Sequence, residues 1–453
     1  MSKDISIKRG LDIPLLGEAE KVTGSTDRSD LFFIKPSDFK NLTPKMLVKQ
    51  GDEVKAGAPL FFSKDFPDLK IASPVSGEVV EVVRGEKRLI LGVKILADKE
   101  TRYAEFPAAD PSTMSNDDVL KRMIDQCLLA FVKRRPYGTP ARSEDKPKAI
   151  FISGFDSAPL AADLDYALHG KDKEFQAGLN ALSKLTEGKV HLTLHRKHTT
   201  SEVLKGAKGV QINWISGPHP SGNVGVQIHH ISPINKGEVI WTVAAQDVAL
   251  IGKAFLSGHY DASRTVALVG SEVVAPKYYK VLQGAPIASL TKGHVKEGNL
   301  RYISGNVLTG SNVGAEGHLG FFDSTITVIP EGNHPKFFIT DGWAGAGLNK
   351  HSASRTYFSW LMPSKKYRLD TNTNGEHRAY VSTGEYENVF PMDIYPQHLV
   401  KAVMIGDIEL MENLGIYEVD EEDFALCEYV CTSKTPVQEV IRGGLALIEK
   451  ECG

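Results

Sequence analysis

The sequence Trp214–His230, WISGPHPSGNVGVQIHH, joins a loop rich in glycine and proline to an apolar segment. Glycine lets two backbones approach closely, and proline fixes the path of the chain between the glycines. After the loop, Val224, Val226, Ile228 and His230 occur at every second position, which predicts a strand with these side chains on one face. A constrained loop before a buried strand is typical of a ligand cleft or domain centre; a tight structural connection is the alternative.

The composition is that of a soluble globular protein large enough for about three domains. The chain has 453 residues, of which 42% are hydrophobic and 24% charged, and its net charge is −3. This charge predicts no general attraction to nucleic acid or anionic lipid. The N-terminus is polar and lacks the apolar core of a signal peptide, and no apolar run approaches the roughly 20 residues of a membrane-spanning helix. Four cysteines in so long a chain make no disulfide framework, which favours a reducing, cytoplasmic compartment.

Residues 31–100 carry a repeated pattern of short strands around glycine turns. It appears in Val48–Leu60, VKQGDEVKAGAPL, and again in Ile71–Val83, IASPVSGEVVEVV. The pattern resembles the barrel-sandwich hybrid of biotinyl and lipoyl domains. Carrier domains of that family place a modified lysine on a hairpin tip before the Pro-x-x-Gly turn. The matching stretch Ser63–Lys70, SKDFPDLK, lacks the family's Asp-Lys-Ala or Met-Lys-Met tip, so we interpret the module as structural.

Residues 101–257 alternate between helical and strand patterns, which predicts an α/β layer with a largely parallel sheet. Ser115 and Asp118 predict a helix N-cap, followed by an apolar stripe that continues to Phe131 and by three cations at the helix C-terminus. The further expected strands are 149–154, 190–194 and 239–243, and the expected helices are 175–185 and 247–257. The glycine fingerprint of a dinucleotide-binding domain is absent between its first strand and helix.

The remaining sequence predicts an N-terminal arm over residues 1–30, a β-grasp module over residues 258–330 and a mostly helical C-terminal region over residues 331–453. Thr371–Gly375, TNTNG, predicts a hairpin turn. Thr435 and Gln438 predict a capping box for a last helix whose apolar stripe includes Ile441 and Leu445.

Neither the histidines nor the cysteines form a convincing metal site in the sequence. Adjacent residues of a strand point to opposite faces, so His229 and His230 cannot bind one ion together. Cys427 and Cys431 supply two of the four thiolates that an iron–sulfur cluster needs, and we interpret them as packed core thiols.

Five motifs in this order carry a resemblance that covers essentially the whole chain: IKRGLDIPLLGEA, SPVSGEVV, SGPHPSGNVGVQIHH, RYISGNVLTG and CEYVCTSK. The chain resembles the A subunits of sodium-translocating NADH:quinone oxidoreductases. The layout is also similar to the C subunit of the Rnf complex and to the flavin subunit of respiratory complex I. These relatives imply a Rossmann-like α/β domain followed by a β-grasp domain.

The resemblance implies a peripheral subunit at the cytoplasmic face of the bacterial inner membrane, within a complex that couples NADH oxidation and quinone reduction to sodium export. The family associates this subunit with quinone. The relatives' flavin loop corresponds to Leu129–Ala141, which has one glycine, so we expect no flavin or iron–sulfur cluster here, and flavins and NADH on other subunits. Candidate quinone-binding residues in this loop and the opening motif are Phe131, Arg134, Arg135, Pro136, Tyr137 and His219.

The resemblance also implies that the integral membrane B subunit of the complex is a partner, reached without direct membrane insertion of this chain. The expected docking surfaces are Ile7–Leu16 and the region from about residue 331. Two alternatives remain: a structural docking subunit that never contacts quinone, and an Rnf-like flavin and iron–sulfur dehydrogenase subunit. The absorption spectrum of the purified chain distinguishes the flavin and iron–sulfur alternative from the other two interpretations. Quinone titration distinguishes a quinone-binding subunit from one that only docks.

We predict that the barrel-sandwich module is never acylated, because no lysine occupies a carrier tip. Intact-mass spectrometry of protein from its native host is expected to match the sequence mass, and a biotinyl or lipoyl addition at Lys64 or Lys70 would contradict the structural interpretation.

Overall fold

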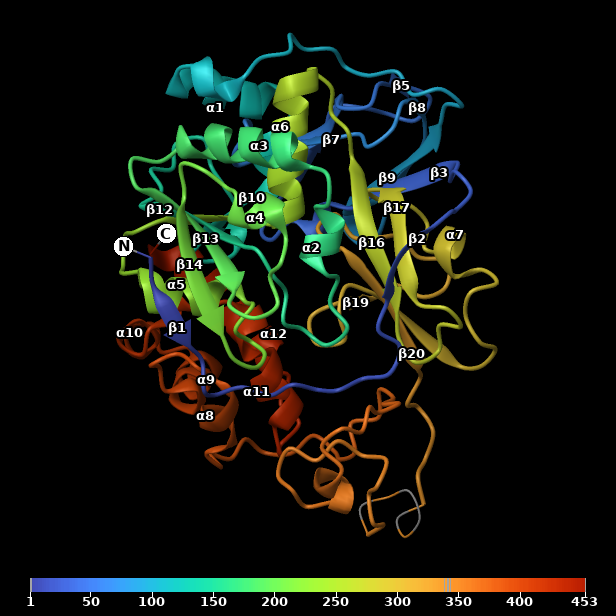
Figure 1. The fold of residues 1–453 in the computed structure, drawn as a ribbon, viewed down its shortest axis with the longest axis vertical. Helices are drawn as coiled ribbons and strands as arrows, with labels where there is room; N and C mark the ends of the chain where they lie inside the picture. The colour runs from blue at the N-terminus through green and yellow to red at the C-terminus, as the bar shows by residue number, and fades with distance from the viewer. Residues whose placement is uncertain (1, 338, 340–341, 343, 453) are drawn as a thin grey trace.

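The structure is a computed structural model that describes residues 2–452 except 338, 340–341 and 343. Its strands form four sheets, and most of the later helices lie together at one end of the α/β half (Figure 1). Among the described residues, no helix combines the length and the apolar character that a membrane crossing requires.

A seven-stranded sheet forms the centre of the α/β half. Its strand order is β1-β14-β13-β12-β15-β10-β11, and the four consecutive strands from β14 to β15 are parallel. The chain runs from β12 to β13 and β14 on one side and then returns to β15 on the other side of β12. The strands are β1 (Asp4–Ser6), β10 (Val132–Arg135), β11 (Thr139–Pro140), β12 (Ala149–Ser153), β13 (Lys189–His195), β14 (Gln211–Ser216) and β15 (Ile240–Val243).

Helices α3 (Asp172–Ser183) and α6 (Ala245–Ser257) pack against each other. A methyl group on Gly252 would lie 1.8 Å from the carbonyl oxygen of Glu174, and one on Gly178 would lie 1.9 Å from that of Val248. The two helices therefore touch backbone to backbone, which only glycine permits. Short helices α2 (Leu164–Ala167) and α4 (Glu202–Lys205) complete the crossovers on this part of the sheet.

The strand predicted after the glycine–proline loop is wrong, because Val224–Ile231 forms helix α5. Four consecutive residues, Gly225–Ile228, are buried, since α5 lies between the sheet and the C-terminal helices. A return from β14 to the parallel strand β15 needs a crossover, and a helix provides it. Valine and isoleucine at every second position are compatible with either structure in so short a segment.

The helix predicted through Phe131 ends early, and the three cations do not lie at its C-terminus. Helix α1 (Asn116–Asp125) begins with the predicted cap, in which the Asp118 N–H donates to the Ser115 hydroxyl. Cys127 then takes a left-handed conformation with φ 57°, which ends the helix, and 3-10 helix η4 (Leu128–Phe131) follows. The cations belong to β10, which pairs antiparallel with β15.

The N-terminal residues belong to both large sheets. Strand β1 adds parallel to β14, and β2 (Glu20–Gly24) adds parallel to β17 of a six-stranded sheet. Between them Ile7, Ile13 and Leu15 are buried. These three side chains pack within the chain, whereas Lys8, Arg9, Asp12 and Leu16 are exposed, so docking through Ile7–Leu16 stays a prediction that concerns only the exposed residues.

The six-stranded sheet has the order β19-β18-β20-β16-β17-β2, with β16 and β20 parallel to each other. Its other pairs, apart from β2, are antiparallel. Its remaining elements are β16 (Ser263–Val269), β17 (Lys277–Leu282), α7 (Ala288–Thr291), β18 (Leu300–Ser304), β19 (Ser311–Asn312) and β20 (Thr325–Pro330).

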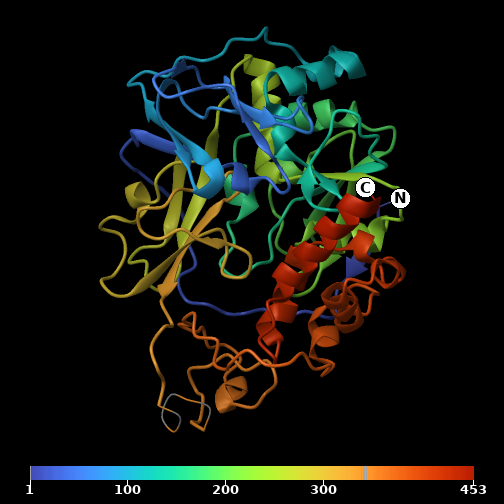
Figure 2. The same ribbon diagram turned by 180° about the vertical axis from the view of Figure 1, so that it is seen from behind.

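The N-terminal barrel-sandwich domain consists of a four-stranded and a three-stranded sheet (Figure 2). The strands are β3 (Leu31–Ile34), β4 (Pro44–Met46), β5 (Glu53–Val54), β6 (Pro59–Ser63), β7 (Lys70–Ala72), β8 (Gly77–Arg84) and β9 (Ile90–Ala97). Gly77 has φ 156°, and a methyl group there would lie 1.9 Å from the carbonyl oxygen of Leu96. The Pro-Val-Ser-Gly turn thus requires glycine where β8 meets β9.

The C-terminal helices are α8 (Glu385–Val389), α9 (Pro396–Ile405), α10 (Ile408–Asn413), α11 (Ala425–Val430) and α12 (Val437–Cys452). The stripe of α12 is confirmed, since Val437, Ile441, Leu445 and Ile448 are buried. The capping box is wrong: the Thr435 hydroxyl has no hydrogen-bond partner, and Glu428 accepts from the Gln438 N–H instead. The hairpin around Thr371–Gly375 is also wrong, because residues 368–381 form no strand.

Replacing Ile441 by alanine is expected to lower the free energy of unfolding by about 2–5 kcal/mol, because it leaves a cavity in a fully buried position. Urea denaturation followed by circular dichroism measures the change. Lys450→Ala, on an exposed position of the same helix, is the matched control and is expected to shift stability by less than about 0.5 kcal/mol.

Candidate functional site

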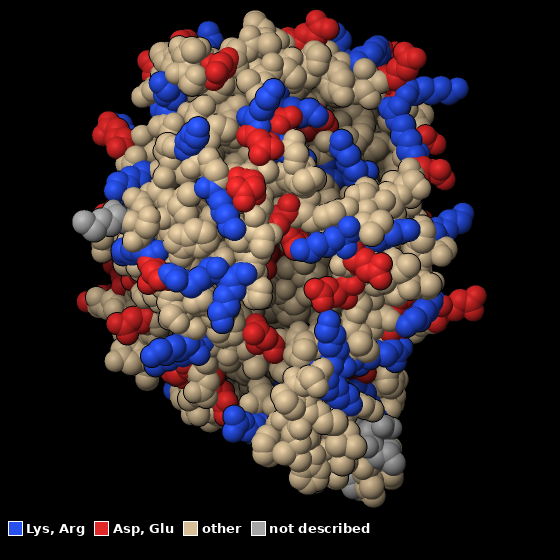
Figure 3. All heavy atoms as spheres, in the orientation of Figure 1, with Lys and Arg blue, Asp and Glu red and all other residues tan. Residues whose placement is uncertain are grey.

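A cavity of about 290 Å³, here called the central cavity, lies at the carboxyl edge of the parallel strands. It is next to the end of β12, where the chain order of the sheet reverses, and such a switch point is where α/β sheets bind ligands. Figure 3 shows a hollow near the centre of one face, with acidic and basic side chains around it. The cavity is closed from outside the sheet by residues of the six-stranded sheet region and of 3-10 helix η7 (Glu421–Phe424).

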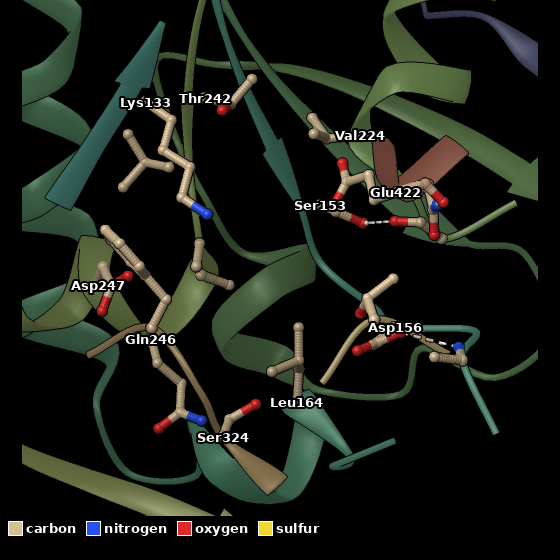
Figure 4. A pocket seen from close by; sticks show the side chains of 18 of the residues that line it. Lys133, Ser153, Asp156, Leu164, Val224, Thr242, Gln246, Asp247, Ser324 and Glu422 are labelled. Atoms are coloured by element: carbon tan, nitrogen blue, oxygen red, sulfur yellow. Dashed lines mark hydrogen bonds between the residues drawn. The ribbon is translucent and has the colours of Figure 1, made fainter. Parts of the chain in front are cut away.

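The starts of α5 and α6 border the central cavity. Neither N-cap residue, Asn223 or Ala244, makes a side-chain capping bond to its helix. Figure 4 shows Val224 and Gln246 at these two helix starts, with Lys133 and Asp247 also at the cavity. The first N–H groups and the positive ends of two helix dipoles thus face the same region, which favours a ligand with hydrogen-bond acceptors.

Arg135 lines the cavity, but its charge is bound by the C-terminal region. Its guanidinium lies 2.5 Å from Glu422, 3.6 Å from Asp420 and 3.5 Å from Asp423, and its side chain is 4% exposed. Lys40 of the barrel-sandwich domain contacts Asp420 at 2.6 Å from another direction. These residues form an ion cluster, here called the Arg135 cluster, that joins three parts of the chain.

The two buried aspartates of the Arg135 cluster have opposite pKa shifts. Burial raises the pKa of Asp423 to about 7, against the attraction of Arg135. Burial is also the largest single effect on Asp420, but the attractions of Arg135 and Lys40 and the hydrogen bonds to the carboxylate together outweigh it and lower the pKa to about 2. One oxygen of Asp423 is buried without a hydrogen-bond partner, whereas the other accepts from the Asp420 N–H. A proton on the unpartnered oxygen fits this arrangement.

His219 lines the same cavity and is held in a defined orientation. The backbone N–H of His219 donates to the Asp12 carboxylate, and the ring Nδ1 lies 3.0 Å from the Ser157 hydroxyl. The Gly222 N–H donates to the same hydroxyl oxygen; in the tautomer with the ring proton on Nε2, the Ser157 hydroxyl donates to Nδ1 and the Nε2–H is the donor that the ring presents. Burial lowers the pKa of His219 to about 4, so the ring is neutral at pH 7.

The other sequence candidates are distributed over different surroundings. Phe131 lines the central cavity and stacks on Phe321 at 5.0 Å between ring centroids. Tyr137 lines an adjoining cavity of about 820 Å³. Arg134 and Pro136 line neither cavity, and Arg134 lies 3.5 Å from Asp145.

Lys133 is a cavity residue that the sequence analysis did not select. It lines both cavities, and its ammonium lies 4.2 Å from the ring centroid of Phe322. Lys133 forms no ion pair among the described residues, although its charge acts on Asp247, which lines the same cavity. In a strand Lys133 and Arg134 point to opposite faces, which distinguishes the two cations. The helix predicted for this segment hides that difference.

Two further carboxylates, one buried and one exposed, line the cavity. Asp247 is 1% exposed and pairs with Arg264 through one oxygen, while the other oxygen has no hydrogen-bond partner. Burial raises its pKa, and Arg264 and Lys133 oppose the shift. Asp156 also lines the cavity; it is exposed, and one of its carboxylate oxygens accepts from the Ala158 N–H.

The cysteine pair lies in the C-terminal core. Cys427 and Cys431 are buried and free, and the Tyr386 hydroxyl donates to the Cys431 sulfur. Burial raises the pKa of Cys427 well above its usual range. Within the described part of the chain, no group of three or more His, Cys, Asp or Glu side chains could hold a metal ion.

Three family models match consecutive parts of the chain. They are described as the NqrA N-terminal barrel-sandwich hybrid domain, the NqrA second alpha/beta domain and the NQRA C-terminal domain. They match residues 5–98, 114–260 and 265–315, respectively.

Full-length relatives are similar over the whole chain. The A subunits of the Na(+)-translocating NADH-quinone reductases of Photorhabdus laumondii and Hahella chejuensis are each 36% identical to it, over 452 and 450 residues. The corresponding protein of Vibrio vulnificus is 34% identical over 450 residues. Each alignment covers 99% of this chain and 100% of the relative.

Among solved structures, the NAD+-reducing [NiFe]-hydrogenase in the air-oxidized state is similar to 49% of this chain, and the match covers 48% of the hydrogenase chain. The sequence identity is 14% and the TM-score 0.35, a likeness too low to bear on fold or function.

Asp423→Asn is expected to change how stability depends on pH. Because the folded state raises the pKa of Asp423, it binds the proton more tightly than the unfolded chain, so this group's contribution to stability is present below about pH 4 and declines as the pH rises to about 7. The variant cannot titrate and loses this decline, which is at most about 1.4 kcal/mol per pH unit. Urea denaturation of both proteins between pH 4.5 and 7.5 measures the difference, and parallel curves would contradict the raised pKa.

Proposed function

The chain belongs to the family of A subunits of the Na+-translocating NADH-quinone reductase, and we propose that its central cavity binds the headgroup of a quinone. Its relatives are named as subunits of an oxidoreductase that acts on NADH and quinone and translocates sodium ions. In this proposal the chain supplies a quinone site to a complex that couples NADH oxidation and quinone reduction to sodium export.

The chemistry of the central cavity supports the proposal. A quinone headgroup is a flat ring with two carbonyl acceptors, and it needs apolar walls and one or two donors. Phe131 and Phe322 supply aromatic surface, and the neutral His219 ring supplies a donor. The Lys133 ammonium, which forms no ion pair among the described residues, supplies a charged donor, and this is the observation on which the proposal rests.

The other candidates take different roles in this proposal. Arg135 borders the ligand but directs its hydrogen bonds to the C-terminal carboxylates, so it positions the cavity wall. Tyr137 borders the adjoining cavity, which shares Lys133 and Phe322 with the central one and offers room for the rest of the ligand. Arg134 and Pro136 act by shaping the strand end between the two.

We further propose that this chain holds no flavin or iron–sulfur cluster. The segment corresponding to the relatives' flavin loop is largely buried in η4, β10 and β11. A methyl group at its one glycine, Gly138, would lie 2.3 Å from the Asp420 carboxylate, so the loop is pinned against the C-terminal region. It thus offers no open row of backbone N–H groups for a phosphate. The hydrogen-bonded Cys431 and the buried Cys427 favour packing over ligation.

Two finer fold assignments belong to the same proposal. From β12 onward the parallel strands are arranged 3-2-1-4 in chain order, which supports a Rossmann-like domain. The mixed sheet with α7 supports a β-grasp domain within residues 258–330.

We also propose that the chain is a peripheral subunit on the cytoplasmic face of the membrane, held there by the integral B subunit of the complex. The C-terminal helices offer a docking surface, because Tyr395, Met404, Ile405 and Leu410 of the α9–α10 region are exposed. A stable contact between subunits buries well over about 1,000 Å² of surface, so a docking surface must combine several exposed side chains, as the α9–α10 region does. If this docking were the chain's whole role, the purified chain would bind no quinone.

Lys133→Gln is expected to weaken quinone binding by about tenfold to a hundredfold, because a hydrogen bond from a charged donor is lost. The measurement is titration of the purified full chain with a short-tailed quinone, followed by tryptophan fluorescence.

His219→Ala is expected to act in the same direction, while Lys280→Gln, an exposed lysine of β17, serves as the matched control. Unchanged affinity in both cavity variants would exclude this site. Absence of any binding by the unmodified chain would favour the docking-only role.

A further inference from the structure

Residues 344–369 form a lobe that protrudes at one end of the molecule, here called the basic lobe. Figures 1 and 2 show it beyond the last strand of the six-stranded sheet and away from the α/β half. Its one regular element is the 3-10 helix η5 (Phe358–Leu361). The central cavity and the basic lobe share no residues, so the inference below is independent of the quinone proposal.

The sequence of the basic lobe contains five cations and no acidic residue. The cations are Lys350, Arg355, Lys365, Lys366 and Arg368. The net charge of the whole chain is −3, so this segment differs sharply from the average of the protein. The expectation of no attraction to anionic lipid came from that average, which conceals a local excess of positive charge.

The cations at the base of the basic lobe and those farther out have different partners. At the base, Lys366 pairs with Glu18 at 2.9 Å and Arg368 pairs with Glu272 at 2.6 Å. Farther out, Lys350 and Lys365 donate to uncharged oxygens, the carbonyls of Gly342 and Leu348. Arg355 lies 5.8 Å from the ring centroid of Trp360. None of these three has a carboxylate partner among the described residues; Arg355 is exposed, and Lys350 and Lys365 are half-buried, with their ammonium groups 4.9 Å from the Tyr357 ring and 5.6 Å from the Tyr367 ring.

Large apolar side chains are exposed beside these cations. The exposed fractions are 50% for Leu348, 60% for Phe358, 48% for Trp360 and 60% for Leu361. Figure 3 shows the visible face of the lobe as uncharged, with Lys and Arg side chains gathered near its junction with the rest of the molecule. The lobe therefore exposes aromatic and aliphatic groups, and the exposed Arg355 lies beside one of them, Trp360.

The base of the lobe is anchored, so its outer face keeps a defined direction. Tyr367 is buried and exchanges backbone hydrogen bonds with the N-terminal segment, donating to Pro14 and accepting from Leu16. The nearby Lys336 pairs with Asp370 at 2.7 Å. These contacts fix the root of the lobe on the N-terminal arm and leave the exposed groups on its outside.

We infer that the basic lobe binds the anionic phospholipid headgroup region of a bilayer. Tryptophan and phenylalanine favour the membrane–water interface, where the ring is in an apolar layer and the adjacent cation contacts phosphate. An acidic protein surface would satisfy the cations but leave the exposed Phe358 and Leu361 in a polar contact. Charge complementarity together with this apolar content selects the lipid interface. The contact is shallow, needs no spanning segment, and adds to docking on a membrane subunit.

The test is flotation of the purified full chain with vesicles of neutral phosphatidylcholine and with vesicles that contain about one third phosphatidylglycerol. Binding is expected only to the anionic vesicles and is expected to fall steeply as salt rises, because a surface charge is screened within about 10 Å at 0.1 M salt. Brominated lipids are expected to quench tryptophan fluorescence of the bound chain, and replacing Trp360 by phenylalanine is expected to reduce the quenching.

Lys350→Gln, Arg355→Gln and Lys365→Gln combined are expected to weaken binding roughly a hundredfold, at about fivefold per cation. Phe358→Ser with Leu361→Ser is expected to weaken it by at least about tenfold. Each variant has a matched control that changes exposed residues elsewhere and is expected to leave binding unchanged. The control for the charge variant combines Lys121→Gln, Lys205→Gln and Lys280→Gln, and the control for the apolar variant combines Leu89→Ser and Val274→Ser.

Failure of the unmodified chain to float with anionic vesicles would overturn the inference. Equal binding to neutral vesicles, or equal loss in the lobe variants and the controls, would overturn it as well. Binding of the lobe only to a partner protein, with no vesicle binding, would identify that surface as a protein contact instead. The salt dependence is measured on the unmodified chain, so it tests the inference even if the substitutions disturb the structure of the lobe.

Discussion

The burial of one guanidinium, that of Arg135, constrains how the parts of this protein fit together. A buried charge is strongly unfavourable unless it is paired, and here the partners come from far away in the sequence. Asp420, Glu422 and Asp423 must lie against the end of β10, and Lys40 must reach the same carboxylates from the barrel-sandwich domain. Removing Arg135 would leave two buried carboxylates, Asp420 and Asp423, beside the partly exposed Glu422. The Arg135 cluster therefore fixes the C-terminal region against the end of β10.

This arrangement also creates the central cavity. The parallel sheet by itself would leave the helix starts of α5 and α6 open to solvent at its carboxyl edge. The C-terminal carboxylates and the loops of the six-stranded sheet border that edge and turn it into a cavity. Lys133 then faces the space with its charge unpaired among the described residues, while Arg135 on the same strand is neutralised. The difference between the two cations follows from which of them the C-terminal carboxylates can reach.

The N-terminal segment connects the two large sheets, because β1 extends one and β2 extends the other. It also holds the root of the basic lobe through Tyr367. The central cavity and the basic lobe are thus parts of one molecule with different surroundings. The paired Arg135 cluster borders the cavity, and exposed aromatic groups and cations lie on the lobe. A net charge close to zero describes neither of them.

Much of the local structure could be predicted from the sequence, because short-range physics decides it. The Ser115 cap, the strands at 149–153 and 189–195 and the buried stripe of α12 follow from capping chemistry and hydrophobic period. The motifs of the chain also sufficed to recognise its family. Val224–Ile231 was different, because its apolar period fits a strand or a helix and only the crossover between parallel strands decides for the helix. The segment of Lys133 became a strand because β15, more than a hundred residues later, pairs with it. Pairing partners, buried ion clusters and the cover of a cavity join distant residues, so only the tertiary structure could decide them.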